Sequence, residues 1–320
     1  MNFISLYWDK NHILAHDELL FNFQYLQNRE LNFVLALDLN NKIVGILGFI
    51  GYAPGMERQD ISLALWKVIP NLSDPYLGVK LIHFLDEQTV VRNINCVGIS
   101  KETIGIYKYL GFQTGELDHY AAFNNKCKNF EISIPPLSIK PIEHNQILKF
   151  KSVDAIHPIL SKLHSLEVYK HKDYFKSIDF LRVKYESHPY FDYIFHEVYF
   201  QDIAKGLIVS RSVEHNGGKA LRIIEVIAED KDITKIINNF SQILSGSEYE
   251  YIDVYASGID SIEMKAGNFE FIDNTSEMIV PDYFDPYQKK NTEIFFMAST
   301  QEKVFLFKGD GDQDRPSSKI

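Results

Sequence analysis

The sequence predicts a mixed α/β fold made of two tandem domains, the second a degenerate copy of the first. Three observations support this prediction. Helix-like and strand-like segments alternate through the first third of the chain, a proline-rich stretch at 133–141 interrupts them, and similar segments then recur in the same order. The length of 320 residues suits about two domains. We therefore expect domains at 1–130 and 131–320.

The elements of the first domain follow from hydrophobic periodicity. A helical period opens the domain, two alternating apolar runs around a polar turn indicate a hairpin, and strands and helices then alternate. In chain order the expected elements are a helix at 16–27, strands at 32–39, 42–50 and 61–69, a helix at 77–88, a strand at 94–100, a helix at 104–112 and a last strand at 115–123.

The same order of elements recurs after the proline-rich stretch. Gly206 corresponds to Gly45 in the hairpin, and Gly267 corresponds to Gly111 at the end of a short helix. The difference in residue number between matched positions is nearly constant. Any two α/β domains share part of this order of helices and strands by chance. Duplication explains the constant offset better, so we expect two copies of one unit. The expected counterparts are 202–212, 221–229, 233–244 and 259–271.

Composition excludes several classes of protein. The formal net charge of −10 and pI of about 5.6 disfavour nucleic acid as a partner. No apolar run approaches the ~20 residues that span a bilayer, and the first residues lack the layout of a secretory signal. Cys96 and Cys127 are too few for a disulfide framework, and no zinc motif is present. We expect a cytoplasmic protein without metal, membrane or nucleic-acid partner; its oligomeric state stays open.

One predicted turn has the properties of an anion site. The helix expected at 77–88 follows a strand and a polar turn, so its first backbone N–H groups point at whatever lies in front of the helix. Gly78 lacks the Cβ that would hold a phosphate away from the backbone. A single glycine is also compatible with a simple turn.

The segment at 104–112 strengthens the functional interpretation. Tyr107, Gly111 and Phe112 form a Tyr-x-x-x-Gly-Phe pattern at the end of a helix, and with the element order this resembles the GNAT superfamily of acyl-CoA-dependent N-acyltransferases. The resemblance implies acyl-CoA as co-substrate and Tyr107 as the proton donor to the departing thiolate. The alternative is a core aromatic residue. The implied cofactor-binding residues are Val68, Ile69, Pro70, Leu77, Gly78, Val79, Lys80 and Ser100.

The chain departs from this superfamily pattern in two places. The pyrophosphate loop usually carries several small or basic residues, whereas the stretch 73–78 keeps only Gly78, and Ser100 stands where Asn is frequent. In the second copy, acidic residues at 229–232 would repel a pyrophosphate and Met264 replaces the tyrosine. We therefore expect cofactor binding and chemistry in domain 1–130, and an acceptor-binding or structural role for 131–320.

Strings near both ends and in the middle carry a narrower resemblance. Residues 10–25, 60–68 and 307–316 look like tandem-GNAT sugar N-acyltransferases of bacterial surface-polysaccharide pathways. This implies an acceptor that is a nucleotide-linked, dTDP-type amino-deoxy sugar whose amine attacks the thioester directly in a ternary complex. Asp60, His119 or a chain of water molecules would be the base. The implied acceptor-side residues are His12, Trp66, Lys67, Asp310, Asp312 and Arg315.

Alternatives stay open for several of these residues. The tail at 309–320 has the composition of a disordered acidic segment, and Trp66 and Asp60 are compatible with core packing and a solvated strand end. Tyr283, Phe284 and Tyr287 are either a stacking platform for a nucleobase or packed aromatics. A tandem-GNAT aminoacyl transferase, which the acidic pI disfavours, and a non-catalytic acyl-CoA or sugar binder are the alternative functions.

Overall fold

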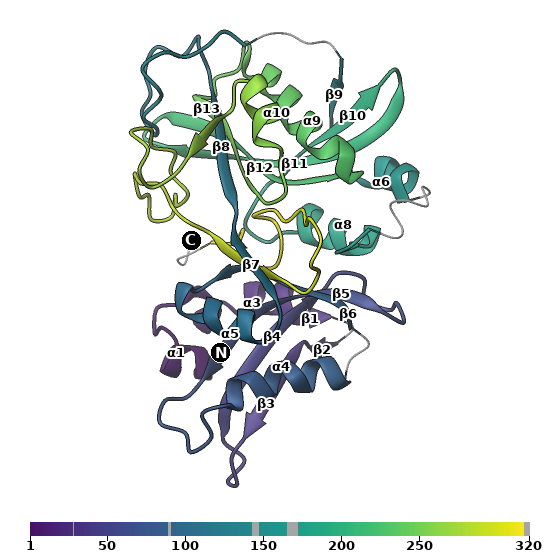
Figure 1. The fold of residues 1–320 in the computed structure, drawn as a ribbon, viewed down its shortest axis with the longest axis vertical. Helices are drawn as coiled ribbons and strands as arrows, with labels where there is room; N and C mark the ends of the chain where they lie inside the picture. The colour runs from purple at the N-terminus through teal and green to yellow at the C-terminus, as the bar shows by residue number, and fades with distance from the viewer. Residues whose placement is uncertain (28, 89–90, 143–146, 165–171, 317–320) are drawn as a thin grey trace.

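The structure is a computed structural model that describes residues 1–27, 29–88, 91–142, 147–164 and 172–316. Two mixed sheets form two bodies stacked along the long axis, and the C-terminal segment runs through the junction between them (Figure 1). Among the described helices, none combines the length and the apolar character needed to cross a bilayer.

The first body is built on a six-stranded sheet with the order β3-β4-β5-β6-β15-β7. Its strands are β3 (Phe33–Leu37), β4 (Ile43–Gly51), β5 (Gln59–Val68), β6 (Val91–Ile99), β15 (Phe295–Ala298) and β7 (Gln113–Glu116), beside the small pair β1 (Leu26–Gln27) and β2 (Glu30–Leu31). Its helices are α1 (Asn2–Tyr7), α2 (Ile13–His16), α3 (Glu18–Tyr25), α4 (Leu77–Gln88), the 3-10 turn η1 (Lys101–Thr103) and α5 (Ile104–Tyr109).

The second body is built on a seven-stranded sheet with the order β14-β8-β13-β12-β11-β10-β9. Its strands are β14 (Glu270–Ile272), β8 (Asp118–Phe123), β13 (Tyr251–Ala256), β12 (Gly218–Ala228), β11 (Ile203–His215), β10 (Ile194–Phe200) and β9 (Lys149–Val153). The described helices are α6 (His157–His164), α8 (Ile178–Glu186), α9 (Asp230–Phe240), the 3-10 turn η2 (Ser241–Leu244) and α10 (Ser261–Ala266).

The two sheets repeat one topology, as the sequence predicted. β4 and β5 pair antiparallel and β5 and β6 pair parallel, and β11, β12 and β13 do the same in the second sheet. The helices α4 and α9 follow the equivalent strands, and α5 and α10 precede the equivalent short strands β7 and β14. The mixed α/β fold with two tandem units is confirmed.

The strand expected at 115–123 is wrong, because the chain divides it between the two sheets. β7 stays in the first sheet, and after Leu117 the chain enters the second sheet as β8, between β13 and β14. In return β15 enters the first sheet between β6 and β7. Each unit thus receives its penultimate strand from the other half of the chain. The boundary expected near residue 130 stays a prediction.

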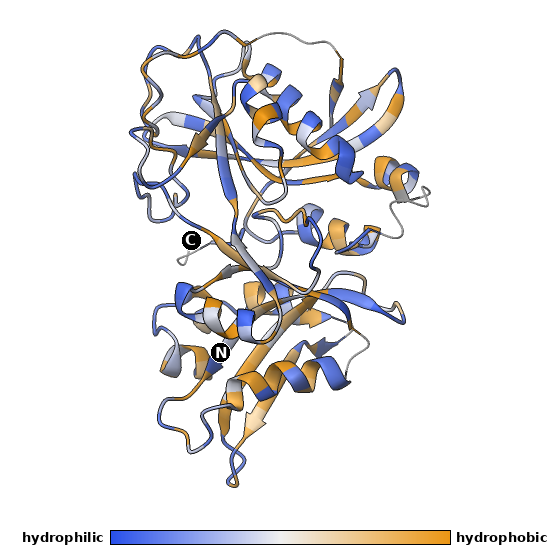
Figure 2. Cartoon of the chain, viewed as in Figure 1, coloured by the Kyte–Doolittle hydropathy of each residue, from blue (hydrophilic) through white to orange (hydrophobic). Residues whose placement is uncertain are grey.

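This exchange joins the two bodies through a shared apolar core. One cluster of buried side chains contains Leu20 and Leu65 of the first body, Leu207 and Ile224 of the second, and Phe296 of the exchanged strand β15. Burying this surface ties the units together, because separating them would return it to water. Strands such as β4 and β12 are mainly hydrophobic, whereas the helices carry both hydrophobic and hydrophilic residues (Figure 2).

Candidate active site

The strands β5 and β6 separate part of the way along the first sheet. Their parallel pairing runs from Gln59 opposite Val91 to Ser62 opposite Asn95. Beyond Ser62, β5 continues along β4 and β6 continues along β15. A β-bulge lies at this point, because two residues of β5, Ala64 and Leu65, lie opposite one residue of β4. The result is a V-shaped opening between two neighbouring strands.

Backbone N–H groups of β5 face this opening. The N–H of Ile69 donates to the carbonyl of Val44 on the β4 side. Because hydrogen-bonding directions alternate along an antiparallel pair, the N–H groups of Val68 and Trp66 point to the opposite edge, where β6 has moved away. These donors are placed to bind a carbonyl or amide of an extended ligand lying beside β5.

The end of helix α5 fixes the position of Tyr107. Gly111 has a φ of +85°, its N–H donates to Lys108 O, and the Phe112 N–H donates to Tyr107 O at 3.0 Å. This is a Schellman cap, and its usual hydrophobic contact is present between the rings of Phe112 and Tyr107, whose centroids are 6.0 Å apart. The Tyr-x-x-x-Gly-Phe pattern therefore locks the tyrosine onto the inner face of its helix.

Tyr107 lies in the apolar cluster between α4, α5 and the separating strands. It is buried, and its ring centroid lies 5.4 Å from that of Trp66. Burial, together with the nearby Cys96 thiol, raises the pKa of the Tyr107 phenol well above its usual range. The phenol therefore stays protonated at every physiological pH. Both interpretations, proton donor and core aromatic, fit this position, so the catalytic role stays a proposal.

The start of helix α4 differs from the expected anion site. A Cβ on residue 78 would meet the Trp66 ring at 3.1 Å, and the Trp66 indole N–H donates to Gly78 O at 3.1 Å. Gly78 therefore makes room for an indole ring. In front of the helix, the Asp74 carboxylate accepts a hydrogen bond from the Tyr76 N–H at 3.0 Å and forms an ion pair with Lys80 at 2.6 Å. An acidic side chain thus already occupies part of the notch.

The structure argues against both side chains proposed as the base. Asp60 is buried and already bound: it forms a two-point ion pair with Arg92 and accepts the Phe175 N–H at 2.8 Å. His119 lies in the second sheet, with Nε2 at 3.1 Å from Asp253 and its ring stacked on Tyr255 at 3.8 Å. Burial lowers the pKa of His119. The identity of the base stays a proposal.

The equivalent opening in the second unit is filled by the chain itself. β12 and β13 also separate, after Ile223 and Val254, and β12 carries the extra residue Ile224. The segment 306–309 enters this opening: the Gly309 N–H donates to Ile224 O at 2.9 Å and the Lys308 N–H to Tyr255 O at 3.2 Å. A backbone segment thus holds both sides of the second opening.

The start of helix α9 also differs from the start of helix α4. The acidic residues at its start are paired with lysines, Asp230 with Lys172 at 2.7 Å and Glu229 with Lys231 at 2.6 Å. Met264 is fully buried at the position of Tyr107. In the described part of the second unit the opening is therefore filled, the start of α9 is acidic, and Met264 replaces the tyrosine, which agrees with the expected degeneration.

The C-terminal tail is a buried turn as far as Pro316, and the last four residues of the expected tail lie outside the described residues. Asp310 pairs with Lys176 at 2.8 Å, and Asp312 accepts the Tyr25 hydroxyl at 3.1 Å and Arg315 Nε at 3.3 Å. The two aspartates expected to bind acceptor are thus already committed to other side chains. Arg315 and His12, in contrast, line a cavity.

The remaining predicted residues keep their expected positions without further evidence of a role. Lys67 lies opposite Ile46 within β5. Ser100 follows β6, and its carbonyl accepts the Thr103 N–H at 3.0 Å. At the end of β6, Gly98 adopts a φ of +85° in a bulge opposite β15.

The cavity that His12 and Arg315 line has a volume of about 310 Å³ and lies at the junction of the two bodies. Its walls include Gly98 and Ile99 at the open end of β6, so it adjoins the separating strands. Sequence reasoning missed Arg211, Glu293 and Gln313 in its lining. No local pattern marks them, because the fold assembles them from distant parts of the chain.

Comparisons with known proteins bear on the fold. No protein-family model and no curated protein matches the chain. A GCN5-related N-acetyltransferase from Anabaena variabilis is similar in structure, with 13% identity, a TM-score of 0.50, and coverage of 83% of this chain and 62% of that one. A probable N-acyltransferase from Enterococcus faecalis has 14% identity, a TM-score of 0.46, and coverage of 81% and 59%.

The chain spans less than two thirds of the length of both structures. At this level of identity the likeness to the Anabaena protein concerns the fold. The chain therefore has the mixed α/β fold of the GCN5-related N-acetyltransferases.

Proposed function

We propose that the protein transfers an acyl group from acyl-CoA to an amine. The observation that supports this most is the V-shaped opening between β5 and β6, with free N–H groups along β5 and the capped Tyr107 helix beside it. An extended amide-containing arm fits along such an edge, because backbone donors and acceptors there have no strand partner. The Asp74 carboxylate in front of α4 affects how tightly the pyrophosphate of CoA would bind there.

The notch at α4 fits a pyrophosphate after a small rearrangement. The first-turn N–H groups at Gly78 and Val79 have no acceptor within the helix, and the helix dipole favours an anion there. The Asp74 and Lys80 side chains that occupy it are exposed, at 38% and 64%. An exposed ion pair contributes little stability, so a phosphate replaces the carboxylate at low cost and gains Lys80 as a partner.

We further propose a nucleotide-linked amino sugar, of the dTDP type, as the acceptor. The resemblance of the chain termini to sugar N-acyltransferases suggests it, and the cavity beside Gly98 supports it by its position and polar lining. The neutral amine would attack the thioester while a β5 N–H polarises the carbonyl, Tyr107 protonates the leaving sulfur and water accepts the amine proton. The amide and free CoA thiol are the products.

Release of free thiol tests the proposed function. The full chain is mixed with acetyl-CoA or longer acyl-CoA thioesters and a panel of amines: nucleotide-linked amino sugars, free amino sugars and aminoacyl-tRNA. We expect thiol release and a product heavier by the acyl group with an amino sugar nucleotide. Tight CoA binding without thiol release for any amine would establish a binder instead, and transfer of the aminoacyl group from aminoacyl-tRNA to an amine, with release of tRNA and no CoA thiol, would establish the aminoacyl transferase.

The filled second opening predicts the stoichiometry of cofactor binding. Because residues 306–309 hold both strands of that opening, we expect one CoA per chain. Isothermal titration calorimetry with CoA measures this number. Replacing the exposed Lys80 with glutamate should weaken binding at that one site, because the cation proposed to pair with the phosphate becomes a carboxylate. Two sites per chain would contradict the assignment of cofactor binding to the first unit.

A further inference from the structure

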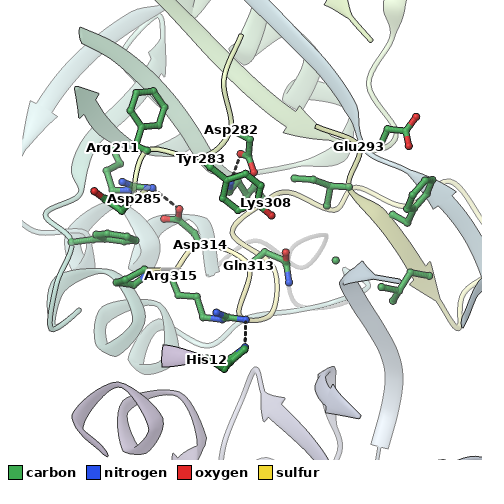
Figure 3. A pocket seen from close by; sticks show the side chains of 17 residues that line it. His12, Arg211, Asp282, Tyr283, Asp285, Glu293, Lys308, Gln313, Asp314 and Arg315 are labelled. Carbon is green, nitrogen blue, oxygen red and sulfur yellow. Dashed lines mark hydrogen bonds and ion pairs between the residues drawn. The ribbon is translucent and has the colours of Figure 1, made fainter. Parts of the chain in front are cut away.

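The cavity at the junction of the two bodies has two chemically different ends. Arg211 and Arg315 lie on one side and Glu293 lies across the open space from them (Figure 3). Gly98 and Ile99 of β6 also line the cavity. Ile99 belongs to the same apolar cluster as Tyr107, so the cavity adjoins the proposed reaction centre through this residue.

His12 and Arg315 form a contact that lacks an acceptor. His12 Nδ1 accepts the Leu14 N–H at 3.2 Å, so its proton must lie on Nε2 when the ring is neutral. Burial, followed by the charge of Arg315, lowers the pKa of His12 to about 4, which keeps the ring neutral at pH 7. The Nε2 atom lies 3.5 Å from Arg315 Nη2, a contact marked in Figure 3. Two donors therefore face one another, as they do around an anion.

Arg211 adds a third donor on the same side. Its Nη2 donates to Asp314 at 2.8 Å. Its guanidinium stacks on Phe191, with Cζ 3.9 Å from the centroid of the ring. Within the described residues its Nε is buried and has no partner. A buried N–H without an acceptor is costly, and a guanidinium fork matches the oxygens of a phosphate.

The two buried carboxylates on this side of the lining, Asp282 and Asp314, do not cancel this donor set, and a further lining carboxylate, Asp285, is exposed. Asp314 is held by Arg211 and by the Tyr193 hydroxyl at 2.7 Å. Asp282 is held by Arg222 at 3.1 Å and by Lys308. Both carboxylates are thus committed within the protein, which leaves the spare N–H groups of the arginines available for a ligand.

The opposite end suits an amine. Glu293 is exposed, and it forms no ion pair within the described part of the chain. The Gln313 side chain lies against Gly98, where a Cβ would meet it at 2.1 Å, and so places an amide beside the open end of β6. A carboxylate and an amide oxygen next to the reaction centre attract and orient an amino group.

We infer that this cavity binds the acceptor lengthwise, with the diphosphate of a nucleotide held by His12, Arg211 and Arg315, and the amine held at Glu293 and Gln313. The assignment of the amine end depends on the proposed function. The assignment of the diphosphate end depends only on the unpartnered donors, so it holds even if the proposed function is wrong.

Binding of nucleoside diphosphates tests the diphosphate end without any acyl transfer. Thymidine diphosphate, uridine diphosphate, pyrophosphate and CoA are titrated into the full chain. We expect a nucleoside diphosphate to bind at least about ten times more tightly than pyrophosphate, because the aromatic walls add contacts to the base. CoA should not displace it. Pyrophosphate binding as tightly, or displacement by CoA, would overturn the inference.

Three variants locate the bound nucleotide. Arg315→Gln should weaken nucleoside diphosphate binding roughly tenfold or more, because a charge-assisted bond is lost. His12→Asn keeps the cap on α2 and removes only the Nε2 donor, so several-fold weaker binding is expected. Arg182→Gln, on the exposed face of α8, is the matched control and should bind as the unmodified chain does. Equal affinity of all four proteins would reject the site.

The amine end has a separate readout. Glu293→Gln should leave nucleoside diphosphate affinity unchanged and raise the KM for the amino sugar nucleotide several-fold, with the KM for acyl-CoA unaffected. An unchanged acceptor KM would remove Glu293 from the site. If no amine yields product while the diphosphate results hold, the proposed function fails and the nucleotide site stands; the reverse pattern retains the function and rejects the site.

Discussion

Replacing Arg222 with methionine is expected to lower the free energy of unfolding by roughly 3–5 kcal/mol, the usual cost of leaving buried charges without their partner. Arg222 is fully buried in the second sheet. It donates to Asp253 at 2.8 Å, to Asp282 at 3.1 Å and to Pro281 O at 2.7 Å. Methionine fills similar space but supplies none of these bonds, so among the described side chains Asp253 keeps only His119 as a hydrogen-bond partner.

Chemical denaturation of the full chain measures this loss. The matched control is Arg182→Met, which removes an exposed i,i+4 pair with Glu186 and should cost less than about 0.5 kcal/mol. Adding Asp253→Asn to Arg222→Met should restore part of the stability, because the stranded charge is then absent. Equal unfolding curves for Arg222→Met and Arg182→Met would show that the buried cluster does not stabilise the fold.

The same cluster predicts how the loss depends on pH. In the unmodified chain, burial raises the pKa of Asp253. The Arg222 guanidinium lowers that pKa by more, so the net pKa lies below its ordinary range. That contribution is present above the unfolded pKa of about 4 and is lost as pH falls through the folded value. Without Arg222, burial dominates and the carboxyl takes up a proton at higher pH. The difference in the free energy of unfolding between the variant and the unmodified chain should therefore narrow as the pH falls from 7.

Local patterns predicted the elements that local interactions determine. The helix expected at 77–88 has those bounds in the structure, and Gly111 ends α5 because a residue of positive φ closes the Schellman cap. The repeat was also visible, since both copies keep the same hydrophobic periods. These features depend on residues within a few positions of each other, so their signal is present in a single sequence.

The exchanged strands could not be predicted in this way. Residues 115–123 have one continuous strand-like pattern, yet Leu117 marks the point where the chain passes from one sheet to the other. Both sheets accept such a pattern equally well, so only the global packing decides between them. The strand β15 likewise pairs with β6 although some 200 residues separate them.

The candidate site likewise contains residues that a local motif predicts and contacts that only the folded chain creates. Tyr107 was found from its motif, whereas the contact between His12 and Arg315 joins residues that are 303 positions apart. The three aspartates of the tail read as a solvated acidic run, but each is buried against a cation or a hydroxyl supplied by another element. Pairings of this kind appear only when the chain is folded, and they decide which charges remain free for a ligand.

Replacing Tyr107 with phenylalanine is expected to lower kcat by roughly 10²–10⁴-fold and to leave the KM for acyl-CoA nearly unchanged. Only the hydroxyl is removed, so the contacts of the ring with Trp66 and Phe112 persist. The loss should appear in kcat because the proposed role of the phenol is to protonate the departing thiolate, whereas the proposed contacts for binding come from the backbone of β5. The raised pKa of Tyr107 keeps the donor protonated, so no fall in rate from its ionisation is expected below about pH 10.

Tyr109→Phe is the matched control, because Tyr109 lies on the same helix and is 86% exposed. Steady-state thiol release for both variants, with their thermal unfolding curves, separates the two interpretations of Tyr107. A normal unfolding temperature with a large loss of kcat in Tyr107→Phe alone establishes the proton donor. A normal kcat in a folded Tyr107→Phe protein would make Tyr107 a packing residue, and the proton for the leaving sulfur would then have to come from water in the opening between β5 and β6.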